Sequence, residues 1–179
     1  MLLALVLVVA LGQAADQDTT RLRWGVSVAG AGGFSFGSRA VAAGAGLSAE
    51  LGSTIDDSLA IVARTTLCTL IMSNVATLGA SLEWTPTDHW SLGGGLAVTG
   101  LLNGNDLPSA FGVMVPIRVM FSPTPRGDDQ QSRRGLSLWI EVAQGVHLLG
   151  SAGHVPPGGF VAGPPYMVTG ALGVGYAAW

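Results

Sequence analysis

The sequence predicts an all-β protein: an eight-stranded antiparallel up-and-down transmembrane β-barrel. Three observations lead to this prediction. Apolar residues make up 49% of the 179 residues and charged residues only 11%, well below the roughly 25% of ordinary soluble domains. Glycine occurs 27 times and interrupts nearly every window that could carry an amphipathic helix. Apolar residues instead alternate with small or polar ones, which is the period of a strand with one apolar face.

Composition also excludes several classes of function. The net charge is -3, and Arg133 and Arg134 form the longest basic run, so a nucleic-acid partner is not expected. The single Cys68 has no internal disulfide partner and reads as a small strand residue. The three His have no spacing that would fix a metal ion, and no glycine run precedes a helix as a phosphate-binding loop requires. We therefore expect no cofactor.

The first element, residues 1–15, is expected to be a signal peptide. Its sequence MLLALVLVVALGQAA is an apolar run that closes on small residues before a polar stretch begins. The alternative is a short membrane helix, but the run ends at Gly12, short of the roughly 20 apolar residues that span a bilayer. Residues 16–179 are then expected to form an exported barrel.

The mature chain contains eight candidate strands. In the fifth, Trp90, Leu92, Leu96 and Val98 share one face, and small or polar residues share the other. The strands are expected at residues 22–31, 40–52, 58–70, 74–84, 89–100, 110–121, 135–148 and 166–178. Each is long enough to cross a bilayer at a tilt, and an even number of strands allows the two edges to close.

The charged residues of the expected strands all fall on the polar face. This set comprises Arg23, Glu50, Arg64, Glu83, Arg118 and Glu141, while all eight Asp fall outside the strands. A barrel in lipid points its ionisable groups inward. Because an unpaired buried charge is costly, we expect a hydrogen-bonded lumen network. Two interpretations stay open: a plug of satisfied pairs, or a pathway for ions or protons.

The segment LEWTPTDHW places two tryptophans on either side of a tight turn. Trp84 ends one apolar face and Trp90 begins the next. Together with Trp24 they are expected to form an aromatic girdle at a membrane surface. Gly93 and Gly95, which follow on the lumen face, are expected to leave room for arginines opposite.

These features resemble the small eight-stranded outer-membrane barrels of the OmpA and OmpX type, over residues 21–179. The resemblance rests on the leader, on LEWTPTDHW and on the last strand, YMVTGALGVGYAAW. It implies the outer membrane of a diderm bacterium, contact with outer-membrane lipid and lipopolysaccharide, and insertion by the barrel assembly machinery. Tyr176 and Trp179 would supply the C-terminal assembly signal. The turns at 53–57 and 85–89 would face the periplasm, with the last connection outside and free to contact an unidentified partner.

The resulting functional prediction is a porin-like outer-membrane barrel with a filled polar lumen and a structural or interaction role through its external loops. A narrow channel for ions or small solutes is the alternative, and a soluble exported barrel or sandwich is a third possibility. No enzyme is expected. His147, Ser151 and His154 near the outer rim, with Glu141 below them, have no spacing that would hold a nucleophile and a base within hydrogen-bond reach.

Overall fold

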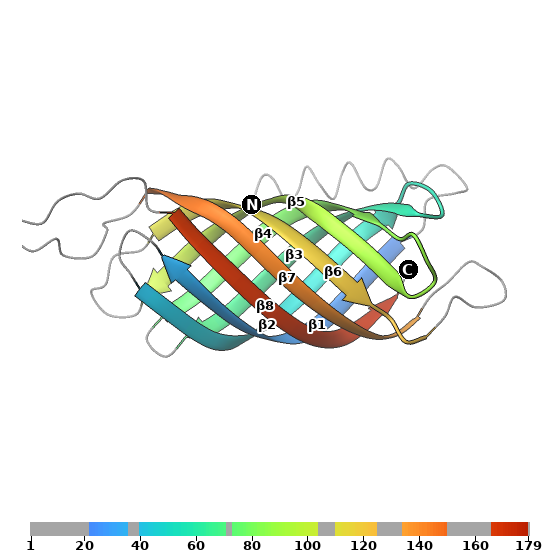
Figure 1. Ribbon diagram of the computed structural model, residues 1–179, viewed down its shortest axis with the longest axis horizontal. Coiled ribbons are helices and arrows are strands. Elements are labelled where there is room, and N and C mark those ends of the chain that lie inside the picture. The colour runs from blue at the N-terminus through green and yellow to red at the C-terminus, as the bar shows by residue number, and fades with distance from the viewer. Residues whose placement is uncertain are drawn as a thin grey trace, which may run out of the picture.

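A computed structural model describes residues 22–35, 40–70, 73–103, 110–124, 134–149 and 166–178, which form a closed barrel (Figure 1). Its strands are β1 (Leu22–Ser35), β2 (Ala40–Thr54), β3 (Leu59–Leu70), β4 (Ser73–Trp84), β5 (Trp90–Asn103), β6 (Ala110–Phe121), β7 (Arg134–Leu149) and β8 (Tyr166–Ala178). Every strand is antiparallel to its sequence neighbours, and β1 closes against β8. The predicted eight-stranded up-and-down barrel is confirmed.

Two strands continue three or more residues further than the sequence predicted. β1 runs to Ser35 instead of residue 31, and β5 runs to Asn103 instead of residue 100. The predicted end falls in a glycine-rich stretch, and glycine weakens strands. In the structure Gly32 pairs with Ala43 on one side and with Gly170 on the other. Pairing with two neighbours therefore outweighs the poor strand propensity of glycine.

The stagger of the strands sets the shape of the barrel. A path perpendicular to the strands leaves β7 at Ser137 and crosses each of the remaining seven strands in turn. It returns to β7 at His147, ten residues further along. For eight strands this stagger corresponds to a tilt of about 40°. The interior is consequently narrow enough for side chains to fill it.

Two irregularities interrupt the ladders beside β6. A bulge lies between Phe111 and Gly112 where β6 pairs with β7. Between β5 and β6, the pairs run to Gly94 opposite Ile117 and resume at Ala97 opposite Met114. The interruption falls at Pro116, which has no N–H to donate to a ladder.

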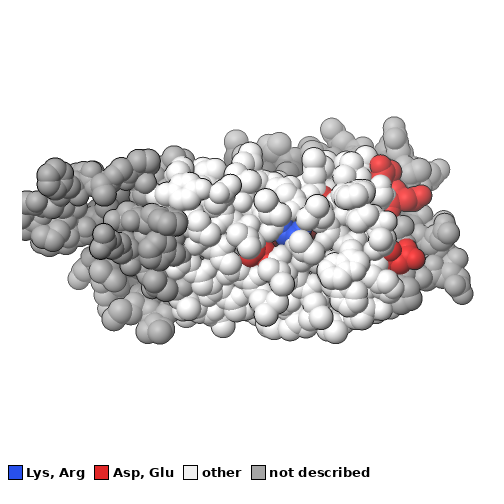
Figure 2. Space-filling model, in the orientation of Figure 1, with Lys and Arg blue, Asp and Glu red and all other residues white. Residues whose placement is uncertain are grey.

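The two faces of the sheet differ as the alternation predicted. Large apolar side chains such as Leu47, Leu96 and Leu172 are exposed on the outside, while small and polar side chains fill the inside. Figure 2 shows the side of the barrel almost uncharged, with a small spot of blue and red near its middle and red at one end. We call this the turn end, because it carries the short turns 55–58 and 85–89.

Within the described residues, no helix is long and apolar enough to span a membrane.

Candidate functional site

Six charged side chains from six strands meet inside the barrel. They are Arg23 of β1, Glu50 of β2, Arg64 of β3, Glu83 of β4, Arg118 of β6 and Glu141 of β7. The exposed fraction of the side chain is 1–9% for five of them and 22% for Glu141. All six residues of the expected lumen network therefore lie together, and we call them the lumen network.

Glu50 is the carboxylate with the most partners in the lumen network. Its Oε2 atom accepts hydrogen bonds from Arg64 Nε at 3.4 Å and from Arg118 Nη1 at 3.3 Å. Its Oε1 atom lies 3.6 Å from Arg23 Nη2. One carboxylate thus contacts all three guanidinium groups.

Arg64 contacts all three carboxylates of the lumen network. Its Nη1 donates to Glu141 Oε2 at 3.2 Å, its Nη2 donates to Glu83 Oε1, and its Nε donates to Glu50. Arg23 Nη2 also donates to Glu83. Three positive and three negative groups make the lumen network neutral. Buried charges persist in proteins when such pairing offsets their loss of hydration.

Interior glycines make room for these large side chains. Gly25 lies directly opposite Glu50 and Gly93 directly opposite Glu83. A Cβ atom at Gly25 would lie 2.9 Å from Glu50 Oε1, and one at Gly93 would lie 2.9 Å from Glu83 Cγ. Arg118 lies directly opposite Gly93, as expected, but the atoms nearest to the missing side chain belong to Glu83. The atoms nearest to a Cβ at Gly95 belong to Ala80 and Ser81, so the expectation that Gly95 makes room for an arginine was wrong.

Trp139 belongs to the interior and was not among the predicted site residues. The Cζ atom of Arg118 lies 4.1 Å from the centroid of the Trp139 ring, a cation–π arrangement. Trp139 is 3% exposed and packs with Ala29 and Met120. The alternation of Leu138-Trp139-Ile140-Glu141 carried the signal, because it places Trp139 on the same face as Glu141.

The chemistry of the lumen network is that of fixed ion pairs. Among the described residues, no group of His, Cys, Asp and Glu is placed to hold a metal ion.

The candidate residues Ser151 and His154 lie outside the described residues, as does the side chain of His147. Residues 1–15 and Trp179 also lie outside them.

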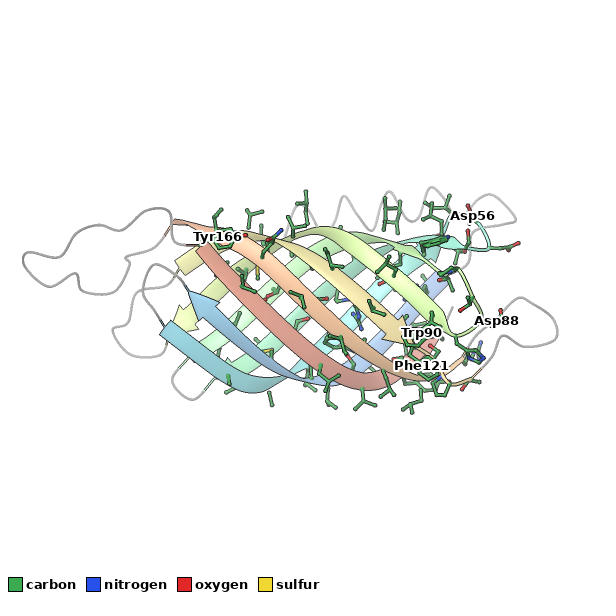
Figure 3. All side chains as sticks on the ribbon, viewed as in Figure 1. Asp56, Asp88, Trp90, Phe121 and Tyr166 are labelled. Carbon is green, nitrogen blue, oxygen red and sulfur yellow. The ribbon has the colours of Figure 1, made fainter. Side chains whose placement is uncertain are left out.

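The three tryptophans of the expected girdle lie on the outer face at the turn end. Trp24 packs against Tyr176 with ring centroids 5.8 Å apart, and Trp90 packs against Phe121 at 4.9 Å. Trp84 is also exposed there. Figure 3 shows Trp90 and Phe121 at the same end of the barrel as Asp56 and Asp88.

A second aromatic level lies near the opposite end and was missed in the sequence. Phe111 precedes Phe121 by ten residues in β6, and Tyr166 precedes Tyr176 by ten residues in β8; all four are on the outer face. The Tyr166 hydroxyl donates to Gln144 Oε1 at 2.8 Å, and Figure 3 shows Tyr166 far from Trp90. Ten strand residues tilted by about 40° rise about 25 Å, the height of the apolar band of membrane barrels.

At the turn end, the connection between β2 and β3 is closed by Asp56. Its Oδ1 atom accepts hydrogen bonds from the backbone N–H of Ser58 at 2.7 Å, the Ser58 hydroxyl at 3.0 Å and the N–H of Leu59 at 2.8 Å. The bonds from Ser58, the backbone one foremost, hold the pKa of Asp56 below its ordinary value.

The fold and its polar interior define a closed eight-stranded barrel with an apolar exterior, and solved structures share it. The chain is similar to the neisserial surface protein A (NspA), with 16% identity, a TM-score of 0.59, and coverage of 89% of this chain and 98% of that chain. It also aligns with the N-terminal barrel domain of Pseudomonas aeruginosa OprF, at 14% identity, a TM-score of 0.43 and coverage of 86% and 96%.

Another match is the outer membrane protein OprG from Pseudomonas aeruginosa, at 9% identity and a TM-score of 0.36, covering 89% of this chain and 95% of that chain. No protein-family profile matches the sequence, and no curated protein sequence matches it. The resemblance to small eight-stranded outer-membrane barrels is thus confirmed at the level of the fold, through the similarity to NspA.

Proposed function

We propose that this protein is an integral outer-membrane barrel whose lumen is closed by the lumen network and whose role is structural or interactive. One observation carries the proposal: the charged residues of the strands point inward and are paired, whereas large apolar side chains cover the outside. The exception, Arg134, is the first residue of β7, at the turn end. A soluble barrel would reverse this distribution.

The proposal includes an orientation and partners. The two aromatic levels fit the two surfaces of one bilayer. The turn end would then face the periplasm, and the opposite end would meet lipopolysaccharide and any external partner. Insertion by the barrel assembly machinery, with Tyr176 and Trp179 as its signal, is part of the same proposal. No catalytic role is proposed.

The competing function is a narrow channel for ions or small solutes. The observation in its favour is the partial exposure of Glu141, which among the described residues forms an ion pair with one arginine, Arg64. Against it, Arg64 joins carboxylates from β2, β4 and β7 and so bridges the lumen from wall to wall. This bridging favours a closed lumen.

The location is tested by expressing the full chain in a diderm bacterium and isolating the outer membrane. We expect the protein in that fraction, and we expect its gel mobility to differ between heated and unheated samples, because a closed barrel resists detergent until it is heated. Recovery from the soluble periplasm without a mobility shift would refute the membrane barrel.

Conduction is tested with folded protein in planar bilayers. The closed lumen predicts no current above that of the lipid alone. A steady current that changes in Arg64→Ala would instead establish the channel, since Arg64 contacts all three carboxylates. A current of the same size in both proteins would place the conducting path away from the lumen network.

A further inference from the structure

An open groove of about 720 Å³ crosses the outer face of the barrel from β7 to β3. On its floor, Gly30 of β1 lies directly opposite Ala45 of β2. A Cβ atom at Gly30 would have no atom beyond its chain neighbours within 4 Å, so the space above the floor is free. One wall is a continuous row of larger side chains that lie directly opposite one another, namely Leu138, Val174, Val28, Leu47 and Leu67.

The groove climbs obliquely between the two aromatic levels. It crosses five strands, and four spacings of about 4.8 Å give it a length of about 19 Å. Because of the stagger, a row that passes from β7 to β3 rises away from the turn end, here by about 12 Å. The wall continues in the same row from Leu67 through Ala76 and Gly100 to Phe111, in the second aromatic level. The groove therefore fits within the hydrocarbon depth of about one leaflet, roughly 15 Å.

The lining of the groove is apolar except at its upper end, the end nearer the second aromatic level. Among the described residues that line it, Thr69 has the one polar side chain. Thr69 lies directly opposite Asn74 of β4, and both are exposed on the outer face. An occupant that matches this lining is apolar over most of its length and has a neutral hydrogen-bonding group at one end. A lipid acyl chain with the carbonyl or hydroxyl group at its head has this chemistry.

We propose that the groove binds one acyl chain of lipopolysaccharide. This inference rests on the proposed outer-membrane location and orientation, in which the end opposite the turn end meets lipopolysaccharide. The chain lies over Gly30 and Ala45, and its head group meets the Thr69 hydroxyl and the Asn74 amide. A second copy of the barrel fits less well, because its convex surface would rest on the wall at Leu47 and leave the floor unfilled. In a bilayer, where packing drives association, a flexible chain that fills the groove makes more contacts.

The occupant is identified by native mass spectrometry of the full chain, purified in mild detergent from the outer membrane of a diderm bacterium. We expect a species that contains a single barrel and one lipopolysaccharide molecule. A barrel without lipid, a barrel that retains phospholipid alone, or a dimer without lipid would each overturn the inference and leave the outer-membrane location standing. Absence of the protein from the outer-membrane fraction would refute the proposed function and this inference with it.

Two matched pairs of substitutions locate the site. Ala45→Leu fills the floor of the groove, whereas Ala49→Leu adds the same side chain to the outer face of β2 outside the groove. Thr69→Val removes the hydroxyl at the polar end, whereas Thr65→Val removes an exposed hydroxyl of β3 outside the groove. We expect Ala45→Leu and Thr69→Val to retain several-fold less lipopolysaccharide than the wild type, and the two control variants to retain as much.

Equal retention in all four variants, or an equal loss within each pair, would overturn the assignment to this groove. The heat-dependent gel mobility shows whether each variant is folded. If Ala45→Leu does not fold, the comparison of Thr69→Val with Thr65→Val decides.

Discussion

Glu50 and Glu141 carry the same charge in the same network but differ in how many guanidinium groups they contact. Glu50 contacts Arg23, Arg64 and Arg118, whereas Glu141 contacts Arg64 and is partly exposed. Removing one partner of a buried ion pair leaves the other charge buried and uncompensated. The two residues therefore provide a matched pair of neutralising substitutions.

We expect Glu50→Gln to lower the free energy of unfolding by about 3 kcal/mol and Glu141→Gln by about 1 kcal/mol. Urea unfolding of the protein in lipid vesicles, followed by tryptophan fluorescence, measures both. Equal losses in the two variants would mean that the number of arginine contacts does not set the contribution of each carboxylate.

Gly173, which faces the interior, and Gly170, which is exposed on the outer face, test the role of interior glycines within one strand. A Cβ atom at Gly173 would overlap the Trp139 ring, whereas a Cβ atom at Gly170 would have no atom within 4 Å. Overpacking of this kind costs about 1–3 kcal/mol, so Gly173→Ala should destabilise the barrel and displace Trp139 from Arg118. Gly170→Ala should be neutral or slightly stabilising. Unfolding midpoints and near-ultraviolet circular dichroism report both effects, and equal stability of the two variants would contradict the packing argument.

At the scale of the strands, alternation predicted which face each residue takes. It placed Glu50 and Glu83 inside and Trp84 and Trp90 outside, as observed. It could not predict which arginine pairs with which carboxylate, because that depends on the stagger between strands far apart in sequence. Glu141 and Arg64 meet across the lumen, for example, although 77 residues separate them.

The ends of the strands were harder to predict than their faces. Ser35 and Asn103 end strands that continue past glycine or polar residues. At such residues, only pairing with the neighbouring strands decides whether the strand continues. The second aromatic level was available in the sequence as a ten-residue spacing, from Phe111 to Phe121 and from Tyr166 to Tyr176. The height that this spacing spans depends on the tilt of the strands, which the stagger fixes.

The turn between β2 and β3 should make a pH-dependent contribution to stability. The folded state lowers the pKa of Asp56. At pH values between the folded and the ordinary pKa, the folded carboxylate therefore binds fewer protons than the unfolded one. The stabilisation is therefore present above the ordinary Asp value of about 4 and is lost as the pH falls through the folded pKa. The difference in unfolding midpoint between wild type and Asp56→Asn should be largest near neutral pH and shrink in acid. A difference that does not change with pH would show that the charge of Asp56 does not contribute.

At the scale of the whole molecule, the barrel reverses the usual arrangement of a soluble protein. Its charges neutralise one another inside, and its apolar side chains face outward between two aromatic levels. The depth of a residue between these levels should then decide what a charge on the outer face costs. Leu172 lies between Tyr166 and Tyr176 on β8, whereas Leu22 is the first residue of β1. Their exposed fractions are similar, 61% and 65%, so they differ mainly in depth.

We expect Leu172→Arg to lower the free energy of unfolding in a bilayer by about 2–4 kcal/mol and Leu22→Arg by about 0–1 kcal/mol, because the cost of a lipid-facing arginine falls from the midplane to the interface. Urea titrations in lipid vesicles give both values. In water, an arginine at either exposed position would cost little. A small and equal effect of the two substitutions would therefore mean that the outer face of β8 does not meet lipid, whereas a large effect confined to Leu172 would place the bilayer between the two aromatic levels.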